Sequence, residues 1–192
     1  MLRPHLNFFP VTTTIEFDDV PSGTAIDTHY QSQGATFASI TTSPPSQSSA
    51  FATFSALART PTNTVSIDPT SSTFYGELGG IKVTFDRLVF GVSIYARATV
   101  TPERMLVDPQ DNRAFIVALD ENDNFLGETT YPHPWWDPNF GDWQNLAVTS
   151  AGALQHIFVA KIKSVVFSSQ HVGAPNVWAA FDTLRFWRFE AV

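Results

Sequence analysis

The most unusual stretch of this 192-residue sequence runs from Tyr131 to Trp143 and contains three of its five Trp residues and three Pro residues. Proline lacks a backbone N–H and is excluded from helix interiors and central strands, so an ordered loop is expected. Two indoles are adjacent and cannot easily face one core, so at least one is expected at the surface. Aromatic rings present apolar faces on which the C–H faces of sugars pack, and polar groups beside them can bind hydroxyls. The loop is therefore interpreted as a carbohydrate-binding surface formed by Tyr131, His133, Trp135, Trp136, Asp137 and Asn139.

The alternative for this loop is that its indoles close one end of the protein core. Trp143 begins a strand-like run, and packing is the favoured interpretation there. Trp178 and Trp187 lie in the last expected strand, where packing in the core or on a sheet face is the default for a large aromatic side chain. The carbohydrate hypothesis therefore depends mainly on Trp135 and Trp136.

Carboxylates near both ends of the sequence suggest a bound cation. Glu16 and Asp18 are two positions apart, so both would point to the same face of a regular strand. Asp182 precedes an apolar strand, where a buried carboxylate without a partner would be unfavourable. Calcium takes about six to eight oxygen ligands, so one Ca²⁺ ion shared by the first and last strands would resolve both problems. The alternative is that these carboxylates meet solvent or pair with Arg185 or Arg188.

The run Asp120–Asn124 also offers oxygens at alternating positions, as a calcium-binding EF-hand loop does. That loop requires Gly at its sixth position and Glu at its twelfth, which Phe125 and Tyr131 occupy here. The run separates two β-like segments, so it is interpreted as a plain hairpin turn.

Catalytic motifs are scarce in the sequence. There is no G-x-S-x-G, H-E-x-x-H, P-loop or G-x-G-x-x-G pattern. His133 with Asp137 and Asp142 could form a general acid–base set, but all three lie in one loop, so their closeness in sequence is weak support. Enzymatic activity on sugars is therefore kept only as an alternative.

Composition excludes several classes of protein. A net charge of −7 and a pI near 5.0 disfavour nucleic acids and anionic polysaccharides, because an acidic surface repels both. The absence of cysteine excludes disulfide scaffolds, thiol nucleophiles and Cys-ligated zinc. No apolar run reaches the roughly 18 residues of a membrane span, and no secretory signal is visible at the N-terminus.

The elements that position these residues are expected to be strands. Aromatic and β-branched residues are plentiful, and 13 Pro with 10 Gly leave few windows for a helix. The pattern predicts one all-β domain over residues 1–192, a two-sheet antiparallel β-sandwich or jelly roll, with 1–10 as an irregular arm. The expected strands are Thr12–Phe17, Ile81–Phe85, Leu88–Ala96, Ala114–Leu119, Phe125–Thr130, Trp143–Val148, Ile157–Ser168 and Val177–Phe189. Ser32–Phe51 and Thr60–Thr73 are expected to be loops or irregular edges, and Pro21–Gln33 is expected to hold one helical turn.

Short motifs carry a resemblance to a known class of domains. They are Ile15–Thr24, Gly34–Phe37, Val117–Gly127, Trp143–Val148 and Phe181–Phe186. Their order is similar to that in bacterial secreted jelly-roll domains and resembles carbohydrate-binding modules with a galactose-binding-like fold. The resemblance implies a secreted or cell-surface location. It also implies a structural calcium ion that ties the first strand to the last, at positions matching Glu16, Asp18, Asp19 and Asp182.

The residues and the resemblance together favour a non-catalytic, lectin-like carbohydrate-binding domain with a structural Ca²⁺ ion, no nucleic-acid partner and no membrane span. Two alternatives remain, a structural or self-assembling jelly-roll protein and a sugar-active enzyme. Sugar binding without turnover would select the first hypothesis. A concentration-dependent oligomer without ligand would select the second, and turnover lost in His133→Ala or Asp137→Ala would select the third.

Overall fold

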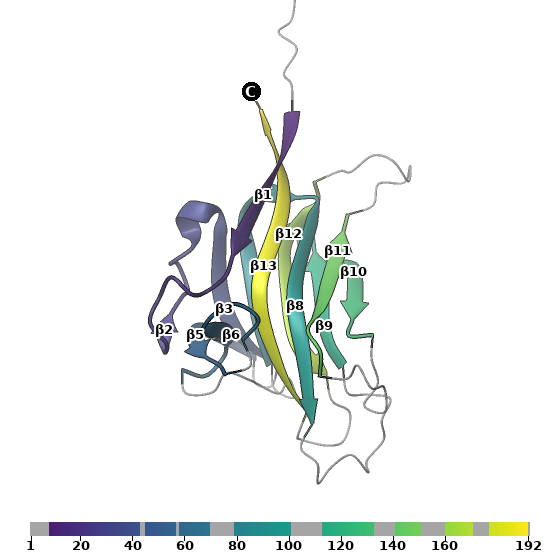
Figure 1. Cartoon of the computed structure of the whole chain (residues 1–192). Helices are drawn as coiled ribbons and strands as arrows, with labels where there is room; N and C mark the ends of the chain where they lie inside the picture. The colour runs from purple at the N-terminus through teal and green to yellow at the C-terminus, as the bar shows by residue number, and fades with distance from the viewer. Residues whose placement is uncertain are drawn as a thin grey trace, which may run out of the picture.

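The computed structural model describes residues 8–42, 45–56, 58–69, 79–100, 113–132, 141–150, 160–170 and 177–191. They form two antiparallel sheets packed on one another, which confirms the predicted all-β sandwich (Figure 1). One short 3-10 turn, η1 (Gln31–Gln33), lies between strands of these ranges. No helix within them is long and apolar enough to cross a membrane.

The first sheet has seven described strands, in the order β11-β8-β13-β6-β5-β2, with β1 paired to another part of β13. These strands are β1 (Phe8–Ile15), β2 (Thr24–Ala25), β5 (Phe51–Phe54), β6 (Asn63–Ser66), β8 (Gly91–Val100), β11 (Gln144–Thr149) and β13 (Val177–Ala191). The second sheet has six described strands, in the order β10-β9-β12-β7-β3-β4. They are β3 (Ala35–Thr42), β4 (Pro45–Ser48), β7 (Gly79–Val89), β9 (Arg113–Leu119), β10 (Phe125–Thr130) and β12 (Ile162–Gln170).

Alternating apolar residues fill the space between the sheets. In β7 every second residue of Ile81–Phe85 is buried, as the alternation predicts. Aromatic rings meet across the sheets, with centroids 4.9 Å apart for Phe167 and Phe181 and 4.8 Å apart for Phe85 and Phe186. Burying each such ring contributes roughly 1.5–3 kcal/mol, so this core holds the two sheets together.

The last strand joins the two ends of the chain. β13 has 15 residues; it pairs with β6 at Phe181 and with the whole of β1 further along. Between the two parts Thr183 has a φ of 48°, and the register against β8 shifts there. The first and last strands therefore lie side by side, and the segment after β1 meets the middle of β13 (Figure 1).

Two segments predicted as loops contain strands. Residues 32–51 include β3 and β4, and residues 60–73 include β6. Ser39 in β3 and Thr64 and Ser66 in β6 are buried, although Ser and Thr are common in turns. Their strands pair with neighbours, so tertiary pairing overrides the local preference.

Other boundaries differ by a few residues. The expected strand Leu88–Ala96 is interrupted at Phe90, whose N–H donates to the carbonyl of Trp187 at 2.9 Å. β1 begins at Phe8, so the last three residues of the expected arm belong to it, while residues 1–7 lie outside the described ranges. The hairpin turn is confirmed, because Asp120 Oδ1 accepts hydrogen bonds from the N–H groups of Asn122 and Asn124.

Candidate functional site

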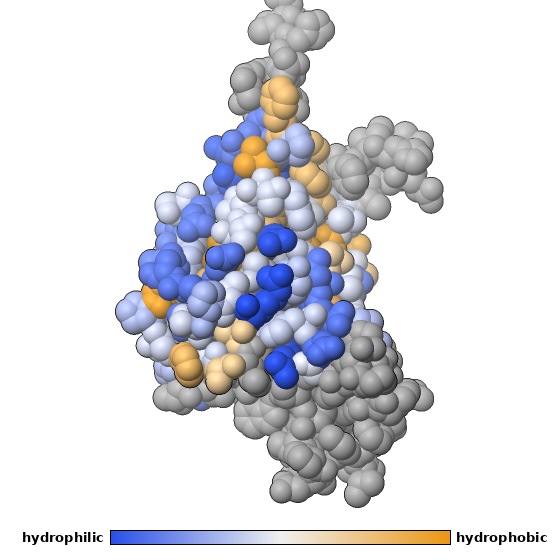
Figure 2. Space-filling model, in the orientation of Figure 1, coloured by the Kyte–Doolittle hydropathy of each residue, from blue (hydrophilic) through white to orange (hydrophobic). Residues whose placement is uncertain are grey.

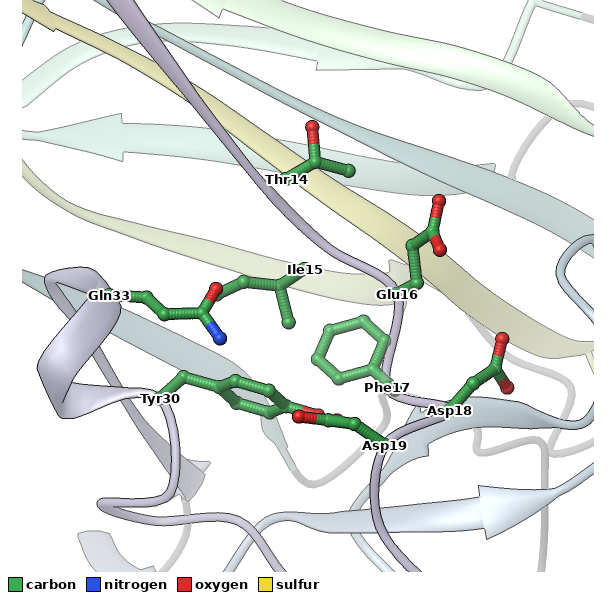
Figure 3. A pocket seen from close by; sticks show the side chains of 8 residues that line it. All are labelled: Thr14, Ile15, Glu16, Phe17, Asp18, Asp19, Tyr30 and Gln33. Carbon is green, nitrogen blue, oxygen red and sulfur yellow. The ribbon is translucent and has the colours of Figure 1, made fainter.

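A pocket of about 430 Å³, the first-turn pocket, lies where the chain leaves β1. In Figure 3 its apolar side chains, those of Ile15, Phe17 and Tyr30, turn toward one another, whereas Thr14 and Glu16 point away from them. A volume of roughly 300–1,000 Å³ with a few placed polar groups is typical of a small-molecule site. The full lining is Thr14, Ile15, Glu16, Phe17, Asp18, Asp19, Tyr30 and Gln33.

Phe17 lines the pocket at the point where the backbone leaves the extended conformation of β1. β1 ends at Ile15, and Phe17 has a φ of 63°, in the left-handed region. A non-glycine residue in this region costs about 1–2 kcal/mol. The fully buried ring offsets that cost by packing edge-on against Tyr30 and Phe37, at 5.8 and 5.7 Å between centroids. The predicted strand continued through Phe17, whereas the observed strand ends two residues earlier.

Tyr30 and His29 hold the carboxylate of Asp19 at the pocket. The buried Tyr30 hydroxyl donates to Asp19 Oδ1 at 2.5 Å, and His29 Nε2 lies 3.3 Å from Asp19 Oδ2. Burial, followed by the hydrogen bond to Asp19, raises the pKa of Tyr30, so its proton stays on the hydroxyl. Burial also raises the pKa of Asp19, but the hydrogen bonds from Tyr30 and His29 outweigh it, and the pKa lies below its ordinary value of 3.8. Asp19 is therefore a fixed, ionised acceptor.

Asp18 fastens the turn to the start of β6. Its Oδ1 accepts hydrogen bonds from the N–H groups of Thr62 and Asn63, at 3.1 and 2.7 Å, and from the Thr62 hydroxyl at 2.9 Å. The Asn63 side chain in turn donates to the carbonyls of Phe17 and Val20. Asp18 Oδ2 is buried and has no hydrogen-bond donor among the described residues.

Asp182 anchors a second loop on β13. It is fully buried, and its Oδ2 accepts the N–H groups of Arg59 and Thr60 at 2.8 and 3.0 Å. The Thr60 hydroxyl lies 3.0 Å from Oδ1 of Asp182 and 3.3 Å from the carbonyl of Glu16. Burial raises the pKa of Asp182 above 3.8, although the hydrogen bonds from Thr60 and Arg59 oppose that shift. The carboxylate thus links the turn after β1, the loop at Arg59 and the last strand.

The carboxylates predicted to bind calcium have separate surroundings in this structure. Asp18, Asp19 and Asp182 each accept protein hydrogen bonds, and Glu16 is exposed. Within the described ranges no three His, Asp or Glu side chains are grouped as a metal site. The oxygen that would best fit a cation is Asp18 Oδ2, since a buried carboxylate oxygen requires a donor or a cation.

The loop predicted to bind carbohydrate lies mostly outside the described residues. This applies to His133, Trp135, Trp136, Asp137 and Asn139. Tyr131 is described and is only 3% exposed. Its hydroxyl donates to the carbonyl of Asp142 at 2.6 Å and accepts from the N–H of Gly141 at 3.2 Å. Tyr131 therefore connects the two described ends of this loop by hydrogen bonds.

Three of the residues predicted to bind calcium, Glu16, Asp18 and Asp19, line the first-turn pocket, but the sequence did not predict a pocket with an apolar floor there. Tyr30 is buried and faces the pocket. Gln33 carried no signal, because an isolated Gln in a polar segment resembles any surface residue. Only the fold brings η1 next to the end of β1.

No protein-family model matches the chain, and no curated protein matches it in sequence. Among solved structures, the K2 cleaved adhesin domain of Lys-gingipain is 15% identical, with a TM-score of 0.48, covering 92% of this chain and 99% of that one. The K3 domain from Porphyromonas gingivalis W83 is 13% identical, with a TM-score of 0.45, covering 91% and 97%.

A third similar structure is a carbohydrate-binding module, the class named by the sequence resemblance. TmCBM61 in complex with β-1,4-galactotriose is 8% identical, with a TM-score of 0.37, covering 93% of this chain and 88% of that one. These identities and TM-scores are too low to assign a family or a function. The site is therefore interpreted from its own geometry.

Proposed function

We propose that this β-sandwich is a non-catalytic carbohydrate-binding domain of a secreted or cell-surface protein. The observation that carries the proposal is the first-turn pocket, in which hydrogen-bonding side chains border an apolar floor. The floor side chains are almost fully buried, so recognition is assigned mainly to the polar rim. A rigid, preformed rim reduces the entropy lost when a ligand binds.

The rim offers complementary partners for sugar hydroxyls. Each Asp19 oxygen accepts one protein hydrogen bond, and a carboxylate has about four acceptor positions, so capacity remains. Gln33 adds an amide that both donates and accepts. A general acid would need a raised pKa, whereas that of Asp19 is lowered, so this carboxylate suits binding rather than proton donation.

A second surface belongs to the same proposal. Trp135 or Trp136 would form a platform on which a sugar ring packs, with Asp137 and Asn139 bonding its hydroxyls and His133 and Tyr131 beside them. The support is the sequence of the loop together with the clamp that Tyr131 makes between its ends. A hot-spot indole of this kind contributes about 2–4 kcal/mol to binding.

A glycan array followed by calorimetry on the strongest neutral glycan tests this function. Gln33→Ala and Asp19→Asn should weaken binding about tenfold if the first-turn pocket is the site. Trp135→Ala and Trp136→Ala should do so if the loop is the site. Gln47→Ala is the matched control, since Gln47 is exposed on β4 and does not line the first-turn pocket. Absence of binding to any glycan, with a concentration-dependent oligomer instead, would reject the proposal in favour of self-assembly.

We also propose a structural calcium ion. It is supported by Asp18 Oδ2, which is buried and has no donor in the described part of the chain, and by the exposed carboxylate of Glu16 two residues earlier. Such an ion would bind the folded state only. At a free Ca²⁺ concentration of about 100 times the dissociation constant, it would stabilise that state by about 2.7 kcal/mol. Adding a chelator should then lower the melting temperature, and Asp18→Asn should remove that response. An unchanged melt in chelator rejects the ion.

A further inference from the structure

Arginines gather on the outer face of the first sheet. Tyr95 and Arg97 share one face of β8, and it is the outer one because Ile94 and Ala96 face the core. Arg185 of β13 lies directly opposite Ser93, two residues from Tyr95 on that face. Figure 2 shows strongly hydrophilic side chains grouped over β13 and β8.

The loop at Arg59 brings a third cation to this face. The backbone N–H of Arg59 donates a hydrogen bond to Asp182, which lies opposite Tyr95 in the pairing of β13 with β8. The guanidinium carbon of Arg59 lies 3.7 Å from the centroid of the Tyr95 ring, which is a cation–π contact. Arg59 therefore contacts Tyr95, while Arg97 and Arg185 lie on the same outer face of the sheet. These four residues are called the arginine face.

The guanidinium groups of these three arginines form no ion pair with a described residue. Arg188, by contrast, lies 2.9 Å from Glu190 and 3.9 Å from Asp86. The Nε of Arg97 is buried and has no acceptor within the same ranges. A buried charged donor without an acceptor is unfavourable, so the charge of this arginine is not compensated by the described part of the protein.

Two acids lie near the arginine face without neutralising it. Asp182 is buried and its oxygens accept hydrogen bonds from Arg59 and Thr60. Glu16 is exposed at the turn after β1 and forms no ion pair with a described residue. Charges interact appreciably only within about 8–10 Å at physiological salt, so the local excess of arginine outweighs the overall charge of −7.

From this arrangement we infer that the arginine face binds an acidic polysaccharide carrying carboxylate or sulfate groups. The planar guanidinium donates two parallel hydrogen bonds to such groups, which a compact ammonium does not. Asn145, exposed beside Tyr95 on β11, and Thr14, exposed opposite Arg185 on β1, provide partners for hydroxyls of the same polymer. The site lies beside the first-turn pocket and shares Thr14 with it; only the choice of a polysaccharide among polyanions rests on the proposed function.

Binding of the intact protein to four polymers tests the inference. Polygalacturonate carries carboxylates, dextran sulfate carries sulfates, dextran is the neutral control and single-stranded poly(dT) carries phosphates. At about 0.15 M salt the protein should bind polygalacturonate or dextran sulfate, and not dextran, with affinity falling as salt rises. Whichever polymer binds more tightly identifies the acidic group.

Variants locate the binding surface. Arg97→Gln and the double variant Arg59→Gln/Arg185→Gln should each weaken polyanion binding about tenfold or more. Arg87→Gln is the control, because it removes the same charge from an exposed position of β7 and should leave binding unchanged. Melting curves show whether each variant is folded; if Arg97→Gln is not, the double variant decides.

Three results would overturn the inference: no binding to either acidic polysaccharide, equal binding by all variants, or equally tight and equally arginine-dependent binding to poly(dT). Gln33→Ala separates this site from the proposed function. That variant should weaken the binding of neutral glycans and leave polyanion binding unchanged. Each of the two proposed sites can therefore be rejected without rejecting the other.

Discussion

The first-turn pocket and the arginine face both border the paired strands β1 and β13. They differ in whether their charged side chains are partnered by other groups of the protein. At the pocket, Asp18 and Asp19 receive hydrogen bonds from Thr62, Asn63, Tyr30 and His29. On the arginine face, the guanidinium groups have no carboxylate in an ion pair within the described ranges, although the chain has 18 acids and 11 bases. Net charge therefore does not determine the sign of a local surface, because each surface is composed of only a few side chains.

Two carboxylates make the comparison sharper. Asp19 is exposed, and hydrogen bonds from Tyr30 and His29 lower its pKa despite some desolvation. Asp182 is fully buried, and burial raises its pKa despite hydrogen bonds from Thr60 and Arg59. Asp182 accepts hydrogen bonds from more donors than Asp19 does, yet its pKa is raised, so the depth of burial decides the direction of the shift.

Removing Asp182 should give the largest effect. Asp182→Ala leaves the N–H groups of Arg59 and Thr60 without their acceptor in a buried position, so unfolding free energy should fall by about 3 kcal/mol. Urea unfolding followed by circular dichroism measures the change. Asp182→Asn is the control, since its amide oxygen can accept both N–H groups. A loss below about 1 kcal/mol in the alanine variant would contradict the anchoring role.

The two carboxylates should next produce opposite pH dependence. The folded-state pKa of Asp182 is raised, so its contribution to stability is full below 3.8 and falls as pH rises through that raised pKa. The folded-state pKa of Asp19 is lowered, so its contribution is present above 3.8 and is lost as pH falls through the lowered pKa. The unfolding free energies of wild type, Asp182→Asn and Asp19→Asn are measured across acidic pH. The difference between wild type and Asp182→Asn should fall as pH rises, whereas the difference between wild type and Asp19→Asn should grow as pH rises. Parallel curves would refute the comparison.

Tyr30→Phe should have an intermediate effect. The ring and its edge contact with Phe17 are kept, while the hydroxyl that donates to Asp19 is removed. Unfolding free energy should fall by about 1–2 kcal/mol, because the lost hydrogen bond has a charged acceptor. Thermal or urea unfolding at neutral pH measures it, and an unaltered stability would mean that the bond contributes nothing.

Lys82→Ala should have the smallest effect. Lys82 Nζ lies 2.6 Å from Asp123 Oδ1, but the Asp123 side chain is 65% exposed. An ion pair in contact with water contributes about 0–1 kcal/mol, so a change near 0.5 kcal/mol is expected. The same urea experiment measures it. If Lys82→Ala lowers the unfolding free energy more than Tyr30→Phe does, the exposed Lys82–Asp123 ion pair stabilises the fold more than the Tyr30–Asp19 hydrogen bond.

The sequence was sufficient for the fold class and for most strands. Alternation in Ile81–Phe85 and the polar turn at Asp120–Asn124 are local patterns, so they are readable without knowing which strands are neighbours. The strands β2, β3, β4, β5 and β6 were missed. The Ser- and Thr-rich segments among them become strands only through pairing, β3 with β7 and β4, and β6 with β5. Local propensity contains no information on such partners.

The candidate sites were harder to predict for the same reason. Sequence by itself determined the all-β class, the apolar faces and the presence of carboxylates near both ends of the chain. The tertiary structure alone decided that Asp182 binds the loop at Arg59, that Tyr30 holds Asp19, and that three arginines lie on the same sheet face as Tyr95. The Tyr30–Asp19 hydrogen bond joins residues 11 positions apart and the Arg59–Asp182 bond joins residues 123 positions apart, while the arginine face combines strands whose register is set by core packing. Their proximity follows from how the whole sandwich buries its apolar surface, which no local stretch of sequence specifies.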